Sequence, residues 1–441
     1  MALRRTWLIA AAAVFVVIAA VIVGPRIVEV ATGTGPAAER LREAAGLRPL
    51  SQADQAVGDL EDLVEEQADD PTAQAQLGAG YLQLARETAD PAYYARAESA
   101  FDRAIELDPG NIDALIGKGS LALSRHEFED ALELGQQARA INSTIPRVYG
   151  VIGDAQVELG QYDEAVATVQ AMVDLRPDLA SLSRVSYLRE LHGDLPGAID
   201  AMERALSAGG PNAENTEFVR VQLGNLHFAS GDLEAAERLY QQSLALLPDY
   251  VHALGGLARV RAAQERFDEA IELYRRATAR LPLPELVIGL GETLEAAGRQ
   301  AEADDEYALV GAMQQLYAAN GVRTDLELAA FFADHGDAQE ALELARAAHE
   351  AQPNVRAADA LAWALYQSGD PEAAWPFTED ALRLGTRDAR IHYHAGMIAR
   401  ALDREEEARE HLAQALELND RFSPLDAPRA AEALAELGPG Q

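Results

Sequence analysis

Residues 251–282, with the sequence VHALGGLARVRAAQERFDEAIELYRRATARLP, contain one complete structural unit of this chain. An apolar helix is expected first, a turn at residues 265–268, and a second helix that opens at Glu269, Ala270 and Ile271. Pro282 ends the second helix, because proline lacks an N–H group and fixes φ. The stretch therefore predicts two antiparallel helices joined by a tight turn.

The alanine of the second helix recurs along the chain with a period near 34 residues. The recurring alanines are Ala97, Ala131, Ala165, Ala198, Ala236, Ala270, Ala303, Ala341, Ala374 and Ala408. In most units a small residue stands earlier, in the first helix: Gly119, Gly153, Ser186, Gly224, Ala258, Gly291, Ala329, Ala362 and Gly396. Small residues at both places let the two helices approach closely. A repeat of this length indicates a helix–turn–helix solenoid.

Further positions agree between units and point to a known family. An aromatic or aliphatic residue usually follows the alanine by four positions, as in Phe101, Val169, Met202, Tyr240, Tyr274, Tyr307 and Leu412. Proline often ends the second helix, as in Pro109, Pro177, Pro248, Pro282 and Pro353. This pattern resembles the tetratricopeptide repeat (TPR) family over residues 71–420. The resemblance implies an all-α, right-handed α-solenoid of about ten repeats, with the ligand along the concave surface made by the first helices.

The repeats set the expected organisation of the chain. We expect an N-terminal transmembrane anchor or signal sequence in residues 1–24, a linker in 25–50, a capping helix in 51–70, the solenoid in 71–420, and a C-terminal capping helix and tail in 421–441. Two of the intervals between the recurring alanines are longer than the others. One contains a Gly/Pro/Asn-rich loop near residues 207–217, and in the other a helix is extended by about a turn after Val310. An insertion near residues 86–94 lengthens the turn or the first helix of the first unit.

Residues 7–23 form an unbroken apolar run. A helix of that length spans about 26 Å, at the lower limit of a membrane span. Arg4 and Arg5 precede the run, which favours a cytoplasmic N-terminus and repeats outside the membrane. The sequence thus predicts a bacterial single-pass membrane protein with extracytoplasmic repeats; a cleaved signal peptide followed by secretion is the alternative.

Composition excludes several classes of function. The 441 residues carry a formal net charge of −35, so nucleic-acid phosphates would be repelled, and no nucleic-acid partner is expected. The chain has no cysteine, which removes disulfides, thiolate catalysis and cysteine-ligated metals. No phosphate-binding loop, catalytic triad or zinc motif occurs. The expectation is a non-enzymatic protein without a cofactor, metal site or catalytic residues.

The strongest candidate binding site lies in the last three units. The resemblance implies which positions face the groove, counted from the small residue of each first helix. In this chain those positions hold arginine and aromatic residues, with methionine among them: Arg323, Arg356, Trp363, Tyr366, Arg390, Tyr393, Met397 and Arg400. Such a set would hold a peptide by ring stacking and by bidentate contacts from arginine to carboxylates. A weaker patch contains Phe218, Asn225, Phe228 and Arg259. The alternative is that the rings pack between repeats and the arginines only solvate the surface.

The expected function is that of a membrane-anchored TPR scaffold which binds a peptide or protein partner in an extracytoplasmic complex. The alternative is a substrate-recruiting or assembly subunit of an envelope enzyme system, of the transferase or cytochrome-maturation type. The partner's identity and the oligomeric state stay open, because a repeat fold accepts many ligands.

Overall fold

The computed structural model describes residues 52–88, 90–210 and 213–438, and these residues form 22 helices and no strand. The helices are α4 (Gln52–Glu66), α5 (Pro71–Thr88), α6 (Ala92–Leu107), α7 (Ile112–Ser124), α8 (Phe128–Ile141), α9 (Pro146–Glu158), α10 (Tyr162–Leu175), α11 (Leu179–Leu191), α12 (Leu195–Ala208), α13 (Ala213–Ala229), α14 (Leu233–Leu246), α15 (Val251–Ala263), α16 (Phe267–Arg280), α17 (Pro284–Ala296), α18 (Gln300–Ala319), α19 (Asp325–His335), α20 (Ala338–Ala351), α21 (Val355–Gln367), α22 (Pro371–Leu382), α23 (Ala389–Ala401), α24 (Glu405–Leu418) and α25 (Asp426–Leu437). The helices from α5 to α24 make ten consecutive antiparallel pairs, which confirms the predicted helical solenoid.

The unit at residues 251–282 shows how the sequence sets each pair. Helix α15 ends where Glu265 takes a positive φ of 60°, and α16 begins at Phe267, two residues before the predicted Glu269. Asp268 and Glu269 both fall in the first turn of α16, where a carboxylate favours the helix dipole. The earlier start therefore places acidic side chains at the positive end of the helix.

Small residues in the first helices accommodate the large residue that follows each alanine. Tyr240 of α14 is fully buried, and its ring lies against Gly224 of α13 and Gly256 of α15. A Cβ atom added at either glycine would come within 2.6 Å of that ring. Phe101 packs against Gly78 and Gly117 in the same way. One aromatic side chain thus joins its own repeat to the next, as close helix packing in a solenoid requires.

The irregular units differ in helix length. The insertion in the first unit lengthens its first helix, because α5 has 18 residues where α7 has 13. The extra residues after Val310 lengthen α18 to 20 residues, as predicted, whereas α16 has 14. The loop expected near residues 207–217 is helical at both ends, because α12 ends at Ala208 and α13, with 17 residues, begins at Ala213. Each insertion is therefore absorbed mainly by a longer helix.

Single helices flank the array at both ends. Helix α4 packs on α5, and α25 packs on α24 and α23. The predicted anchor, residues 1–24, and the linker up to residue 50 lie outside the described residues. Among the helices that the structure does describe, none combines the length and the apolar character needed to span a membrane.

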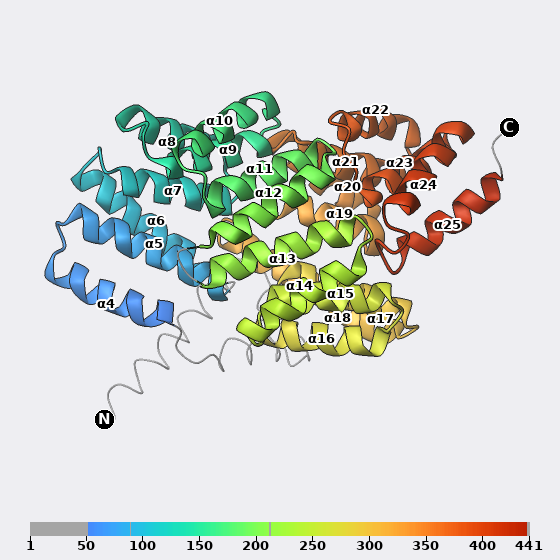
Figure 1. Cartoon of the computed structure of the whole chain (residues 1–441), viewed down its shortest axis with the longest axis horizontal. Coiled ribbons are helices and arrows are strands. Elements are labelled where there is room, and N and C mark those ends of the chain that lie inside the picture. The colour runs from blue at the N-terminus through green and yellow to red at the C-terminus, as the bar shows by residue number, and fades with distance from the viewer. Residues whose placement is uncertain (1–51, 89, 211–212, 439–441) are drawn as a thin grey trace.

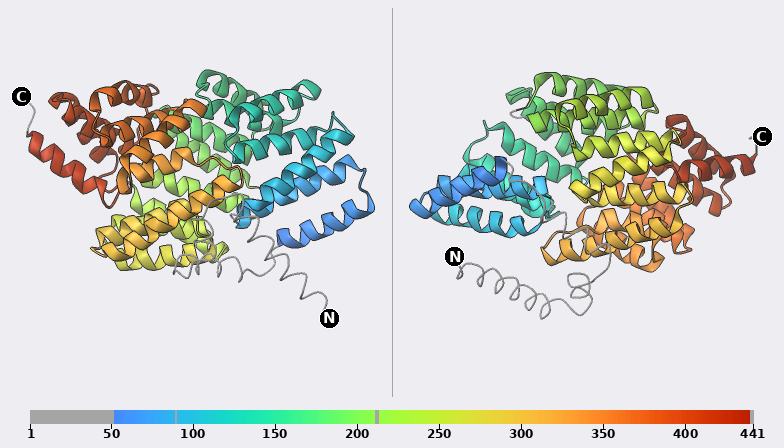
Figure 2. Two further views of the ribbon diagram at one scale, coloured as in Figure 1. Left: turned by 180° about the vertical axis from the view of Figure 1, so that it is seen from behind. Right: turned by 90° about the horizontal axis from the view of Figure 1, so that it is seen from below.

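The array winds so that its later repeats lie beside its earlier ones. In Figures 1 and 2 the chain colour passes from blue through green and yellow, and the orange and red units return to the green units. Asn354, at the start of α21, donates from Nδ2 to the carbonyl and the carboxylate of Glu158 at the end of α9, at 3.2 and 2.9 Å. The Val355 N–H donates to the Tyr162 hydroxyl at 2.9 Å. These partners stand six repeats apart along the chain, so about six repeats complete one turn.

The same contact recurs in the following repeats. The Asn419 amide at the end of α24 donates to the Phe228 carbonyl at 2.7 Å, and Arg421 donates to the Ala263 carbonyl at 3.0 Å. Gly193, in the turn after α11, lies so close to Gly385 that an added Cβ would be 2.1 Å from that carbonyl oxygen. Successive turns of the solenoid are therefore in direct contact.

Candidate binding cavity on the concave surface

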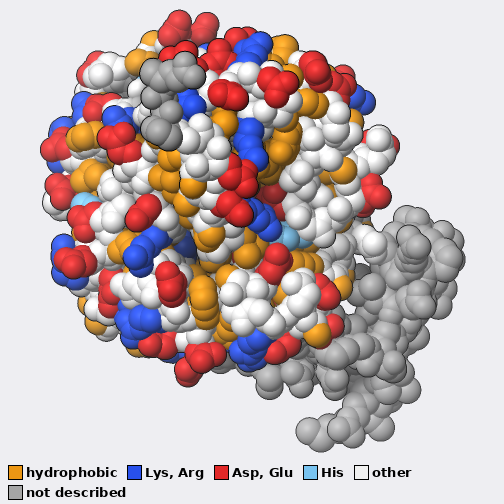
Figure 3. Space-filling view, turned by 90° about the vertical axis from the view of Figure 1, so that its right-hand side faces the viewer, with side chains coloured by type: hydrophobic (Ala, Val, Ile, Leu, Met, Phe, Trp, Pro, Cys, Tyr) orange, Lys and Arg blue, Asp and Glu red, His pale blue; other side chains and the backbone are white. Residues whose placement is uncertain are grey.

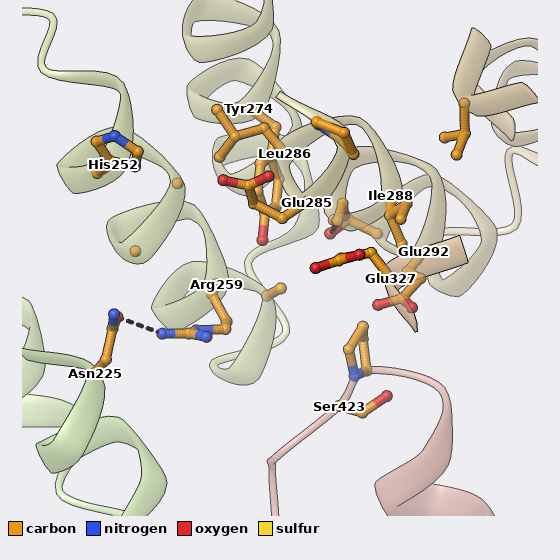
Figure 4. A pocket seen from close by; sticks show the side chains of 18 of the residues that line it. Asn225, His252, Arg259, Tyr274, Glu285, Leu286, Ile288, Glu292, Glu327 and Ser423 are labelled. Carbon is orange, nitrogen blue, oxygen red and sulfur yellow. Dashed lines mark hydrogen bonds between the residues drawn. The ribbon is translucent and has the colours of Figure 1, made fainter. Parts of the chain in front are cut away.

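A cavity of about 490 Å³ lies on the concave surface of the middle repeats (Figure 4). First helices α13, α15, α17 and α19 contribute most of its wall, together with the long α18, Arg390 of α23, and residues 422–424 from the loop before α25. The polar lining residues that matter for binding are Asn225, His252, Arg259, Glu285, Glu292, Gln314, Glu327 and Arg390. The solenoid itself thus builds a partly open cavity that a short segment of a partner could enter.

Three carboxylates stand together at one side of this cavity. Glu285 and Glu292 project from α17 and Glu327 projects from α19 (Figure 4). Burial raises the pKa of the Glu285 carboxyl, and the neighbouring Glu327 raises it further. Glu292 lies 3.6 Å from the His335 imidazole. Neither Glu285 nor Glu327 forms a salt bridge with any of the described residues. The site therefore presents negative charge that the protein itself only partly neutralises.

The arginine on the opposite side is held by neighbouring side chains. Arg259 donates to the Asn225 side-chain oxygen at 2.7 Å and to the Tyr240 hydroxyl at 3.3 Å. Its guanidinium also lies over the Phe228 ring, 4.4 Å from the centroid. Figure 4 shows the Asn225 contact as a dashed line. Two residues of the predicted weaker patch, Asn225 and Arg259, therefore line the cavity. Phe228 does not line it, but its ring packs against the Arg259 guanidinium.

Arg390, from the predicted C-terminal set, also lines the cavity. Burial disfavours its charge, but Glu292, Asp426, Asp334 and Asp388 more than offset this and the pKa of its guanidinium is raised. The four acids come from four different segments of the chain. Arg390 is therefore already surrounded by carboxylates of this protein, and an acidic ligand would have to compete with them.

The aromatic members of the predicted C-terminal set lie inside the packed core. Trp363 and Tyr393 are only 3% and 2% exposed. The Trp363 indole donates to Asp334 at 2.7 Å, and its ring stacks on His394 with centroids 4.1 Å apart. The Tyr366 ring also stacks on Trp363, with centroids 5.0 Å apart, and this side chain is half-buried. In the described structure, Trp363 and Tyr393 have little surface for a ligand to contact.

The remaining predicted residues lie outside the cavity lining. Arg356 is exposed, with its guanidinium 5.3 Å from the Tyr187 ring centroid in the preceding turn. Arg323 pairs with Asp325 at 3.4 Å, and Arg400 pairs with Glu436 of α25. Other predicted residues outside the lining are Met397, which is half-buried, and Phe218, which is 41% exposed. The structure therefore does not bring all the predicted residues into one site.

Counting along α17 would have found the acidic side of the cavity. Arg356 and Arg390 were selected because each stands six positions before the small residue of its helix. Glu285 stands at the same position relative to Gly291, and Glu292 directly follows that glycine. Two of the three carboxylates therefore carried the same sequence signal as the arginines. The loop residues 422–424 carried none, because only the winding of the solenoid brings them to α15 and α17.

A buried histidine beside this region makes stability depend on pH. Burial alone would lower the pKa of His394, but Asp359, at 3.0 Å, outweighs burial, so the net pKa lies above 6.5. This pair stabilises the fold fully below the unfolded pKa, and the contribution is lost as the pH rises through the folded pKa. We expect Asp359→Asn to lower the free energy of unfolding by about 1–3 kcal/mol near pH 5.5 and by less near pH 9. Urea unfolding at both pH values measures this; an equal loss at both would contradict the assignment.

Histidines elsewhere do not make a metal site in the part of the chain that the structure describes. His392 and His411 face each other with Nδ1 atoms 3.0 Å apart. Burial lowers the pKa of both rings. No group of three or more histidine or acidic side chains within the described ranges is arranged to hold an ion.

Sequence profiles of the tetratricopeptide repeat family match the chain at residues 94–144, 122–190, 221–283 and 389–422. This chain carries tetratricopeptide repeats. Tetratricopeptide arrays are generally non-catalytic scaffolds for protein–protein interaction. The matched stretches include the second half of α13 and all of α15 and α23, which contribute to the cavity wall.

Similar proteins of curated function contain comparable arrays. The cellulose synthase operon protein C of Xanthomonas axonopodis pv. citri (strain 306) is 29% identical over 283 residues, which make up 60% of this chain and 17% of that protein. The protein CTR9 homolog of Arabidopsis thaliana is 25% identical over 218 residues, or 47% of this chain and 20% of that protein. The chain thus spans about a fifth of the length of these relatives.

Among solved structures, the APC/C hetero-tetramer Cut9-Hcn1 is 14% identical, with a TM-score of 0.37, and covers 92% of this chain and 97% of that chain. The human IFIT1 dimer with PPP-AAAA is 13% identical, with a TM-score of 0.46, and covers 87% of this chain and 95% of that chain.

Proposed function

We propose that this chain is a non-enzymatic tetratricopeptide scaffold that holds a segment of a protein partner in the cavity of its middle repeats. The observation that carries the proposal is the cavity itself, because its 490 Å³ are bounded by several first helices and by a loop from the next turn. Cavities of this size are typical of sites that take a ligand. Apolar lining residues such as Ile288 and Tyr317 alternate there with polar ones, as binding of a peptide requires.

The test introduces a large side chain that occupies part of the cavity. Gln314 lines the cavity from α18, whereas its neighbour Gln315 is exposed and does not. We expect Gln314→Trp to reduce in-cell crosslinking to the partner by about tenfold or more, because one blocked contact region costs at least about 1.4 kcal/mol. Gln315→Trp is the matched control and should leave the crosslinked set unchanged. Equal crosslinking by both variants would reject the cavity as the site.

We further propose that residues 1–24 anchor the array in a bacterial membrane, with the repeats on the extracytoplasmic side. The apolar run at residues 7–23 and the arginines before it support this placement. A cysteine in place of the exposed Ser207 should react with an impermeant maleimide in intact spheroplasts. Protection of that cysteine would contradict the topology.

A second candidate function is an assembly or substrate-recruiting subunit of an envelope enzyme system. It is favoured by the similarity to two proteins named as cellulose synthase operon protein C, from Xanthomonas axonopodis pv. citri and from Komagataeibacter xylinus. A synthase or transferase that copurifies with this chain, and whose activity is lost with Gln314→Trp, would support this function over that of a scaffold for non-enzymatic partners.

A further inference from the structure

The charges around the cavity differ from those that the arginine-rich sequence pattern suggests. Glu285, Glu292 and Glu327 line it together with Arg259 and Arg390. His252 also lines it, but burial lowers the pKa of that ring, which favours its neutral form. With all three glutamates ionised, a simple balance of these groups gives one net negative charge, although the pKa of Glu285 is raised.

The two arginines have less charge to offer a ligand than that balance implies. Arg390 faces Asp334, Asp388 and Asp426 in addition to Glu292. Arg259 makes its hydrogen bonds to Asn225 and Tyr240 and covers the Phe228 ring. The Arg259 guanidinium is thus held by other groups of the protein. The Arg390 guanidinium forms no salt bridge with the described residues, but the four acids around it offset its charge. The field inside the cavity is therefore set by the carboxylates of α17 and α19, in a chain whose net charge is already −35.

The wall beside the carboxylates is suited to the stem of a long cationic side chain. Pro284, Ile288 and Tyr317 line the cavity together with Glu285, and Phe422 lines it from the loop before α25. The methylene stem of lysine or arginine packs against such apolar surface while its charged end reaches a carboxylate. Glu285 and Glu327 are able to accept that end because neither forms a salt bridge with the described residues.

We propose that the partner segment held in this cavity is basic, and that a lysine or arginine side chain of the partner lies between Glu285, Glu292 and Glu327. The inference rests on the proposed function, since it names the chemistry of the segment that the cavity holds. It reverses the polarity expected from the sequence, in which groove arginines would have bound carboxylates of a partner. Charge complementarity of this kind sets specificity and speeds association.

The experiment selects ligands without assuming a sequence. A phage-displayed library of random 12-residue peptides is panned on the purified full-length chain, and the selected peptides are synthesised with a fluorescent label. Their affinities are measured by anisotropy for wild type, for Glu285→Gln/Glu327→Gln and for Gln314→Trp. The matched control is Glu272→Gln/Glu343→Gln, which removes the same charge from two exposed positions outside the cavity.

We expect the selected peptides to be enriched in lysine and arginine. Removing Glu285 and Glu327 should weaken their binding about tenfold or more, because each lost charge contact leaves a cation without its partner, while the control should stay within about twofold. Neutral or acidic peptides that bind wild type and lose affinity only with Gln314→Trp would overturn the basic ligand and keep the cavity. Peptides that bind all variants equally would overturn both this inference and the proposed function.

Discussion

Tyr240→Ala is expected to lower the free energy of unfolding by about 3–5 kcal/mol, the range for deleting a buried ring from a packed core. The Tyr240 side chain is fully buried, and its ring fills the space between Gly224 of α13 and Gly256 of α15. Neither glycine has a side chain that could move into the vacated volume. The interface between two adjacent repeats would therefore be left with a cavity, and stability of a solenoid depends on such interfaces.

The control for this prediction is Tyr240→Phe, which keeps the ring and removes only the hydroxyl. Because Arg259 still donates to the Asn225 oxygen that the hydroxyl contacted, we expect a loss of only about 1 kcal/mol. Urea denaturation followed by circular dichroism measures both variants. If the alanine variant were as stable as the phenylalanine variant, the ring would not hold the two repeats together.

Gly160→Ala/Gly193→Ala is expected to separate successive turns of the solenoid. Both glycines have positive φ values, 69° and 73°. An added Cβ would lie 2.4 Å from the Pro353 oxygen at the first position and 2.1 Å from the Gly385 oxygen at the second. Backbone atoms cannot rotate away, so the contacting repeats must move apart. We expect a larger radius of gyration in small-angle X-ray scattering and faster proteolysis.

A matched pair of substitutions separates this clash from backbone strain. Gly298 and Gly369 also have positive φ values, 73° and 89°, but an added Cβ there meets no atom within 4 Å. Gly298→Ala/Gly369→Ala should lose about 2–4 kcal/mol, because each left-handed alanine costs roughly 1–2 kcal/mol, and Gly160→Ala/Gly193→Ala should lose more because the clash adds to this strain. Only Gly160→Ala/Gly193→Ala should expand the molecule. The same radius of gyration for both double variants would mean that the turns do not press on each other.

Local features of this protein follow from its sequence because they depend on neighbours in the chain. The spacing of alanines and small residues predicted the helix pairs, and the stretch without proline after Val310 predicted the longer α18. Tyr240 was placed on the correct helix face by its distance from Ala236 alone. Such features repeat every unit, so each unit supports the assignment of the others.

The cavity did not follow from the sequence in the same way. Its wall combines α17 with residues 422–424, and these meet only because the array completes a turn in about six repeats. Small differences in packing angle between repeats accumulate over that distance, and no local pattern records them. The same winding decides that Arg390 lies among four acids. The sequence predicts the position of Arg390 on α23, but it does not predict the acidic neighbours that α17, α19 and α25 bring to it.

The contact between successive turns is the central claim, and chemical crosslinking of one introduced cysteine pair tests it most directly. The chain has no cysteine, so Glu158→Cys/Asn354→Cys places two thiols at the contact where the ends of the native side chains are 2.9 Å apart. The control is Glu158→Cys/Glu417→Cys, whose second residue lies in the following repeat, on α24. A direct disulfide would need Cβ atoms about 3.5–4.5 Å apart, and cysteine is shorter than the residues it replaces, so a short bis-maleimide is used to join the thiols. It should join only the first pair, seen as faster migration on a denaturing gel. If neither pair were joined, or both were joined equally, the turns would not be in contact.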